Sequence, residues 1–135
     1  GVRKKMRSGP VPPPRVAMKN LKKLWQAGVT VAAGTDAGNI GTLPGPSIFR
    51  ELKLMQASGL TPRQVLTAAT LNGARVMGRE NELGTLEEGK LAEMVVLGSD
   101  PLADIGNTAD IRLVIKGGEV LRPEQIAPPR ARRDR

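Results

Sequence analysis

The sequence predicts an α/β protein, and more narrowly one section cut from a larger α/β fold. Residues 16–27 follow a helical apolar pattern, and residues 29–33 (VTVAA) form a short β-branched run of the kind found in strands buried on both faces of a parallel sheet. Further helical patterns follow as far as residue 77. Because one buried strand cannot form a stable parallel sheet, we expect its neighbouring strands to come from elsewhere.

The first predicted helix covers residues 16–27 and carries a proposed apolar face. We expect Val16, Leu21, Leu24 and Trp25 to share that face, with the lysines between them turned toward solvent. Gly28 follows as a natural helix stop. Trp25 is therefore interpreted as a packing residue.

Two more helices are predicted after a Gly- and Pro-containing loop at 35–46. Ser47 is expected to cap a helix that runs to about Ser58. Thr61 and Gln64 have the spacing of a capping box, with proline at the first helical position between them. The helix that starts there should continue, with a break, to Met77.

The character of the chain changes to strands and turns after residue 78. Apolar strands are expected at 94–97 and 111–115, separated by a loop at 99–108. Gly117-Gly118 predicts a hairpin into 119–121. We therefore divide the chain into a basic, proline-rich lead-in, a section with one strand and its helices, a small β unit, and a basic tail expected to be disordered. The boundaries of these parts are 1–14, 15–80, 81–122 and 123–135.

Composition excludes several classes of site. The chain has no cysteine, which excludes disulfides and cysteine-bound zinc, and a cytoplasmic setting is the simplest expectation. It has no histidine, so any chemistry that requires imidazole must obtain it from another source. No apolar run approaches the roughly 20 residues that span a bilayer, so no membrane partner is expected.

The net charge of +8 is concentrated at the two ends of the chain. Residues 1–25 carry eight Lys/Arg and no acid, while residues 26–121 are mildly acidic. This pattern raises nucleic-acid binding as one hypothesis. The basic residues are not interleaved with aromatic residues and match no recognition motif, so we expect no specific nucleic-acid partner.

Asp36 is the candidate catalytic residue. It follows the predicted strand directly, in a glycine-rich loop, and enzymes built as α/β barrels place catalytic groups at the C-terminal ends of their strands. An aspartate in such a loop can equally cap the following turn. Position alone leaves these two interpretations balanced. Lys90, in the turn at 87–90, is interpreted as a solvated surface charge.

Several segments, in order, resemble the amidohydrolase superfamily, in particular its imidazolonepropionase-like and metal-dependent dipeptidase branch. Residues 28–39 (GVTVAAGTDAGN) are similar to the last barrel strand and its loop, and residues 45–78 to the helices that follow. Residues 83–105 and 111–122 resemble the return into the family's small β-sandwich and its closing hairpin. Each motif is weak alone, but the ordered set is specific.

This resemblance implies the C-terminal section of a (β/α)8 TIM-like hydrolase barrel with part of a small β-sandwich. It implies hydrolysis of C–N bonds in a small amide, peptide or cyclic amide by water bound to a divalent metal, with zinc expected. Asp36 matches the residue that binds metal and transfers the proton. Gly38 and Asn39 match positions near substrate. The remaining metal ligands would come from a missing N-terminal barrel part, so this chain alone is expected to be inactive and to hold no metal.

The chain departs from the family pattern at two points. Leu43-Pro44 stands where a histidine is expected, which bears on substrate choice, and Glu93 replaces a usual aspartate. A second hypothesis stays open: a non-catalytic, truncated interaction module. In that case an exposed barrel edge would favour a homo-oligomer.

Overall fold

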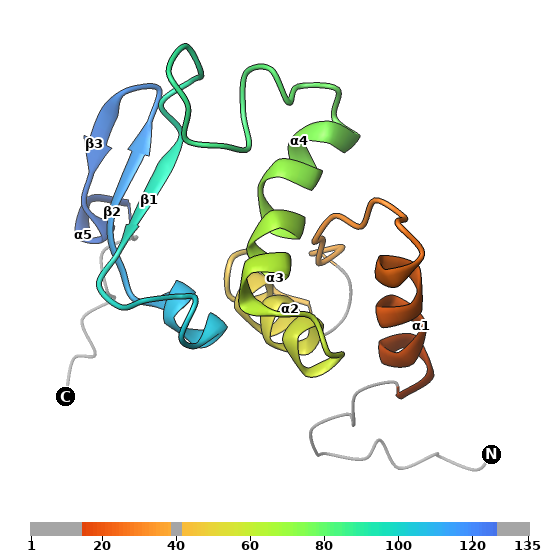
Figure 1. The fold of residues 1–135 in the computed structure, drawn as a ribbon. Coiled ribbons are helices and arrows are strands. Elements are labelled where there is room, and N and C mark those ends of the chain that lie inside the picture. The colour runs from red at the N-terminus through yellow and green to blue at the C-terminus, as the bar shows by residue number, and fades with distance from the viewer. Residues whose placement is uncertain (1–14, 39–41, 127–135) are drawn as a thin grey trace, which may run out of the picture.

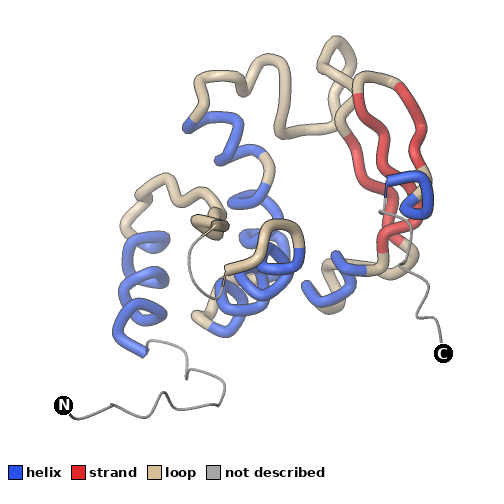
Figure 2. Tube along the Cα trace, turned by 180° about the vertical axis from the view of Figure 1, so that it is seen from behind, coloured by secondary structure: helices blue, strands red, loops and turns tan. Residues whose placement is uncertain are grey.

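The chain is built from two regions of unlike secondary structure, a helical region followed by a small sheet (Figures 1 and 2). The structure is a computed structural model and describes residues 15–38 and 42–126. The predictions for residues 1–14, Asn39 and most of the tail lie outside that range. The helices are α1 (Arg15–Gln26), α2 (Pro46–Ala57), α3 (Pro62–Ala69), α4 (Leu71–Val76) and α5 (Pro123–Ile126), with a 3-10 turn η1 (Ile105–Ala109). The strands are β1 (Met94–Leu97), β2 (Ile111–Lys116) and β3 (Glu119–Leu121).

Helix α1 packs through only part of the face that the sequence predicted. Leu21 and Trp25, four residues apart, pack against the core, whereas Val16 and Leu24 are 73% and 47% exposed. The predicted shared face is therefore wrong for these two residues. Nine residues separate Val16 from Trp25, about two and a half helical turns, which puts the two side chains on opposite sides.

The starts of α2 and α3 differ in how well the sequence predicted them. The capping box before α3 is confirmed: the Thr61 backbone N–H donates to Gln64 Oε1 at 2.8 Å, and the Gln64 N–H donates to Thr61 Oγ1 at 3.3 Å. The predicted Ser47 cap is wrong. Gly45 occupies the cap position of α2 without a side-chain hydrogen bond, and Pro46, with its fixed φ, begins the helix two residues earlier than a Ser47 cap would.

The predicted break in the second helical stretch is confirmed and lies at Thr70. This residue has φ −123° and ψ −85°, which separates α3 from α4. Helix α4 ends at Val76, and Gly78, with a φ of +66°, follows it. The helices therefore run to the point that the sequence indicated.

The hydrophobic core lies in the helical region and accepts one side chain from the sheet region. Its buried members in α2, α3 and the turn between them are joined by Ile105, which is fully buried. The stretch 99–108, expected to be a plain loop, thus contains a 3-10 turn whose first residue anchors the sheet region to the helices. Asp104 caps this turn by accepting from the Gly106 N–H at 2.8 Å. The helical members of the core are Leu52, Met55, Leu60, Val65 and Ala68.

The sheet is an antiparallel arrangement in the order β1-β2-β3, as the predicted strands and hairpin indicated. Lys116 pairs with Glu119 across the Gly117-Gly118 turn, where φ values of +58° and +84° suit glycine. The predicted tail from residue 123 differs in its first four residues, which form helix α5. Residues 127–135 lie outside the described range.

The predicted strand at residues 29–33 is extended but is not assigned as a strand, which corrects the sequence-based expectation. Within the described residues, its contacts go to helices: the Ala33 N–H donates to the Ala68 carbonyl at 3.0 Å. Val29 is 49% exposed rather than buried on both faces. A strand needs a neighbour for its ladder of hydrogen bonds, and the described chain places none beside this segment.

Candidate functional site

Asp36 lies at the end of the extended segment that follows α1. Its φ of +48° makes it the non-glycine residue of the described chain that adopts the left-handed region. Aspartate tolerates this conformation better than most residues because its short side chain can interact locally with the backbone. The residue is exposed, so its carboxylate lies at the surface of the described structure.

The extended segment is attached to the two helices that follow the loop. Besides the bond from Ala33 to Ala68, the side chain of Asn72 donates from Nδ2 to the carbonyl of Val31 at 2.9 Å. Asn72 is 5% exposed, and sequence reasoning did not identify it. Its spacing from Val65 and Ala68, seven and four residues, places it on the buried stripe of α3 and α4, and a polar residue at such a position is the signal that could have found it.

The loop after Asp36 closes partly on itself. The Gly38 N–H donates to the Thr42 carbonyl at 3.1 Å, and Gly38 has a φ of +112°, which favours glycine. This turn role does not test the predicted contact of Gly38 with substrate, and Asn39 lies outside the described residues. Leu43, at the position where a histidine was expected, is 67% exposed.

The described chain does not form a metal site from its own side chains. Across residues 15–38 and 42–126, no three His, Cys, Asp or Glu side chains come together in a way that could hold a metal ion. A catalytic zinc site requires at least three protein ligands, and the predicted site offers one carboxylate, Asp36. The residues present therefore do not fit a bound metal without ligands from another chain or segment.

Glu51, in α2, is a second carboxylate, and its environment disfavours the charged form. Burial raises its pKa above the ordinary value of 4.5 because partial removal from water disfavours the charged form. Raised carboxylate pKa values can mark functional sites. No polar side chain is hydrogen-bonded to Glu51 in the described structure, so this shift carries no assignment.

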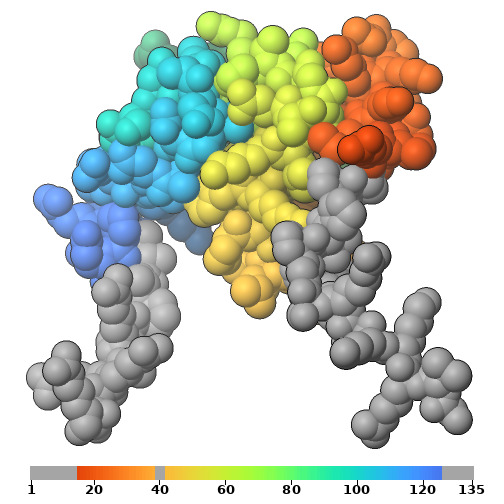
Figure 3. Space-filling model, turned by 90° about the horizontal axis from the view of Figure 1, so that it is seen from below, coloured from red at the N-terminus to blue at the C-terminus, as the bar shows by residue number. Residues whose placement is uncertain are grey.

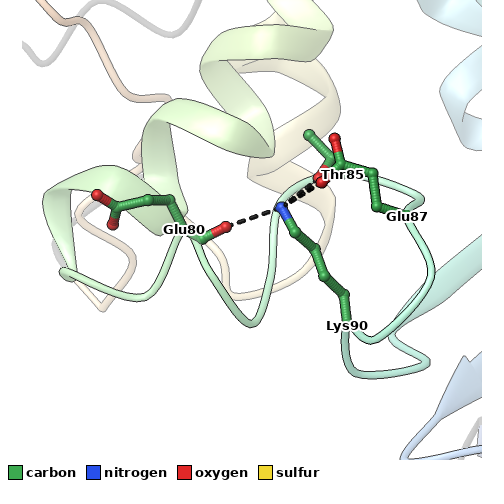
Figure 4. Close-up of polar contacts among 4 residues, drawn as sticks. All are labelled: Glu80, Thr85, Glu87 and Lys90. Carbon is green, nitrogen blue, oxygen red and sulfur yellow. Dashed lines mark hydrogen bonds and ion pairs between the residues drawn. The ribbon is translucent and has the colours of Figure 1, made fainter.

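Lys90 is not the solvated surface charge that the sequence suggested. Its side chain is only 13% exposed, and Nζ donates to the Glu80 carbonyl at 2.8 Å and to Thr85 Oγ1 (Figure 4). The Glu87 carboxylate lies 3.1 Å from Nζ. Lys90 therefore joins three points of the connection between α4 and β1, a structural role that local sequence could not show.

One hollow on the described surface lies away from Asp36. It has a volume of about 470 Å³, lies between α1 and the C-terminal end of α2, and does not include Asp36 among its lining residues. Figure 3 shows α1 and the sheet region at opposite sides of the molecule, with the α2–α4 helices between them. No helix in the described part of the chain has the length and apolar character needed to cross a bilayer.

Comparison with known proteins identifies the family. The model of the amidohydrolase family matches residues 14–121 of the 135. The chain belongs to the amidohydrolase family. It is 36% identical over 106 residues to an imidazolonepropionase of Geobacillus kaustophilus, covering 76% of this chain and 25% of that protein. It is 35% identical over 116 residues to an ochratoxinase of Aspergillus niger, covering 82% of this chain and 23% of that protein.

Solved structures agree with this family assignment. A Xaa-Pro dipeptidase with bound methionine superposes with a TM-score of 0.70 at 28% identity, over 78% of this chain and 25% of that one. A molinate hydrolase superposes with a TM-score of 0.70 at 30% identity, over 84% of this chain and 29% of that one. This amidohydrolase chain thus spans about a quarter of the length of its relatives. Its fold is consistent with a partial TIM-barrel-type domain followed by a small antiparallel sheet.

Proposed function

We propose that this chain is the C-terminal portion of a metal-dependent amidohydrolase that hydrolyses C–N bonds in a small amide, peptide or cyclic amide. The observation that carries the proposal is Asp36 at the end of an extended segment that has no strand neighbour among the described residues, within a chain that matches the family over residues 14–121. An N-terminal barrel part would pair with that segment and supply the remaining ligands. The sheet of β1–β3 would be part of a small β-sandwich.

Asp36 would take part in the reaction as a carboxylate that takes and returns a proton. A divalent metal, with zinc expected, would lower the pKa of bound water when the complete site is assembled. Asp36 would accept the proton from the attacking water and pass it to the leaving nitrogen, as a general base and then a general acid. Gly38 and Asn39 would lie near substrate. Alone, the chain would be inactive.

The test compares the chain alone with a complemented enzyme. The complemented enzyme is this chain produced together with the part of the Geobacillus kaustophilus imidazolonepropionase that precedes the matched region. Zinc content is measured by mass spectrometry, and hydrolysis is assayed on Xaa-Pro dipeptides, N-acyl amino acids and cyclic amides. We expect no stoichiometric zinc in the chain alone, and both zinc and turnover in the complemented enzyme.

The first prediction concerns Asp36 in the complemented enzyme. Asp36→Asn removes the proton acceptor while keeping the size of the side chain, so kcat should fall by about a hundredfold or more. Glu124→Gln, an exposed change in α5, is the matched control and should leave kcat unchanged. Undiminished turnover in Asp36→Asn would remove Asp36 from the mechanism. Tight zinc binding by the chain alone would refute the proposed incompleteness of the site.

A non-catalytic interaction module is the alternative outcome of the same experiment. Exposed apolar side chains on the sheet, among them Val95, Val96 and Val120, favour contact with another protein surface. A complex that forms with the N-terminal part but neither binds zinc nor hydrolyses any substrate would support this alternative. Self-association into a homo-oligomer is read from the mass of the chain alone by light scattering.

A further inference from the structure

The extended segment that leads to Asp36 is held by a small number of contacts with the helices. Two hydrogen bonds tie residues 31–33 to the α3–α4 pair, one from the Ala33 N–H to the Ala68 carbonyl and one from Asn72 Nδ2 to the Val31 carbonyl. Ala68 lies in the last turn of α3 and Asn72 in the first turn of α4, on either side of the break at Thr70. Figure 1 shows this segment, in orange, beside the two helices.

Asn72 is the polar member of this attachment and is itself buried. It is 5% exposed, and neighbours on its helical stripe, Ala68 and Val65, are fully buried. Both ends of its amide are bonded: Nδ2 donates to Val31 at 2.9 Å, and Oδ1 accepts from Arg75 at 3.4 Å. Packing alone would be satisfied by an apolar side chain. The amide adds a donor aimed at a backbone carbonyl 41 residues earlier in the chain.

We infer that Asn72 is a positioning residue for Asp36, acting through the backbone of residues 31–36. This inference rests on the proposed function, in which Asp36 transfers a proton. Asp36 follows Ala33 by three residues, and three residues span at most about 11 Å, so fixing Val31 and Ala33 limits where the backbone can place Asp36. Asn72 holds the segment at Val31 and Ala68 holds it at Ala33, so the two contacts fix the position from which residues 34–36 continue. Asp36, at the end of these residues, has the left-handed conformation.

The first experiment measures amide hydrogen exchange by NMR in the full 135-residue chain. Asn72→Leu removes the donor and keeps a similar volume. It should accelerate exchange at Ala33 by about tenfold or more, because the Val31 carbonyl loses its partner and the segment detaches. Arg75→Ala is the matched control: it removes the other bond of Asn72 and leaves the Nδ2 donor in place. Equal protection of Ala33 in wild type and Asn72→Leu would overturn the inference.

A measurement on the wild-type chain tests the same inference if the Asn72→Leu variant does not fold. The Nδ2 protons of Asn72 should exchange slowly with water and show nuclear Overhauser contacts to the protons that flank the Val31 carbonyl. The absence of both signals, with the rest of the helical region folded, would overturn the inference without any substitution.

The catalytic consequence is read in the complemented enzyme. Asn72→Leu should lower kcat by about tenfold and leave KM unchanged, since it displaces a proton-transfer group and not a binding surface. Arg75→Ala should change neither constant. If Asp36→Asn abolishes turnover but Asn72→Leu matches Arg75→Ala, the positioning role fails while the proposed function stands. If Asp36→Asn retains full turnover, the proposed function fails, and the exchange experiment still decides whether Asn72 holds the segment.

Discussion

The helical region and the sheet region are stabilised in different ways. Within the described residues, the helical region contributes every buried core side chain except Ile105, whereas Val95, Val96 and Val120 of the sheet are 54%, 41% and 56% exposed. The sheet is held by its ladder of backbone hydrogen bonds and is attached to the helices through Ile105, while the Lys90 contacts hold together the connection between α4 and β1. Hydrophobic burial therefore organises one region, and backbone pairing with a few anchors organises the other.

The largest expected effect comes from breaking the apolar anchor between the two regions. Ile105→Ala leaves a cavity where the turn before β2 enters the helical core, and should lower the free energy of unfolding by about 2–5 kcal/mol. Leu102→Ala, in the same connection but 45% exposed, should change it by less than about 0.5 kcal/mol. Urea denaturation followed by circular dichroism measures both. Similar values for the two variants would show that the sheet region does not depend on Ile105.

A smaller effect is expected from removing the hydrogen bonds of Lys90. Lys90→Met keeps most of the aliphatic packing but leaves the Glu80 carbonyl and Thr85 hydroxyl without their donor, at about 1–3 kcal/mol. Lys116→Met, an exposed change in β2, is the matched control. The comparison is made by thermal unfolding at one pH. A Lys90→Met variant as stable as the control would mean that water replaces these contacts at no net loss.

The smallest effect is expected in the helical region, from removing the charge of Glu51. Its raised pKa means that the folded state holds the proton more tightly, so stability falls as pH rises above the ordinary value of 4.5. Glu51→Gln removes the charge and should raise the melting temperature at pH 7, with little difference from wild type at pH 3. Glu88→Gln, an exposed change, should have no effect at either pH. An equal shift at both pH values would exclude ionisation as the cause.

Two apolar, β-branched segments show how far the sequence could predict this structure. Residues 111–115 and 29–33 carry comparable strand patterns, and only the first forms a strand. Its partners, β1 and β3, are close in the sequence: a hairpin joins β3 to it, and the connection that carries η1 joins β1 to it. The described residues place no partner beside 29–33. The pattern reports the tendency of a segment to pair, and pairing itself requires a neighbour.

The sequence by itself determined the features that depend on neighbouring residues: the capping box at Thr61, the break before α4, the glycine hairpin and the family to which the chain belongs. It also predicted Asp36 as the candidate catalytic group, which remains a proposal. Only the tertiary structure decided which apolar residues are buried, that Lys90 is enclosed, and that Asn72 contacts Val31. These depend on contacts between residues far apart in the chain, because burial and long-range hydrogen bonds exist only once separate segments meet.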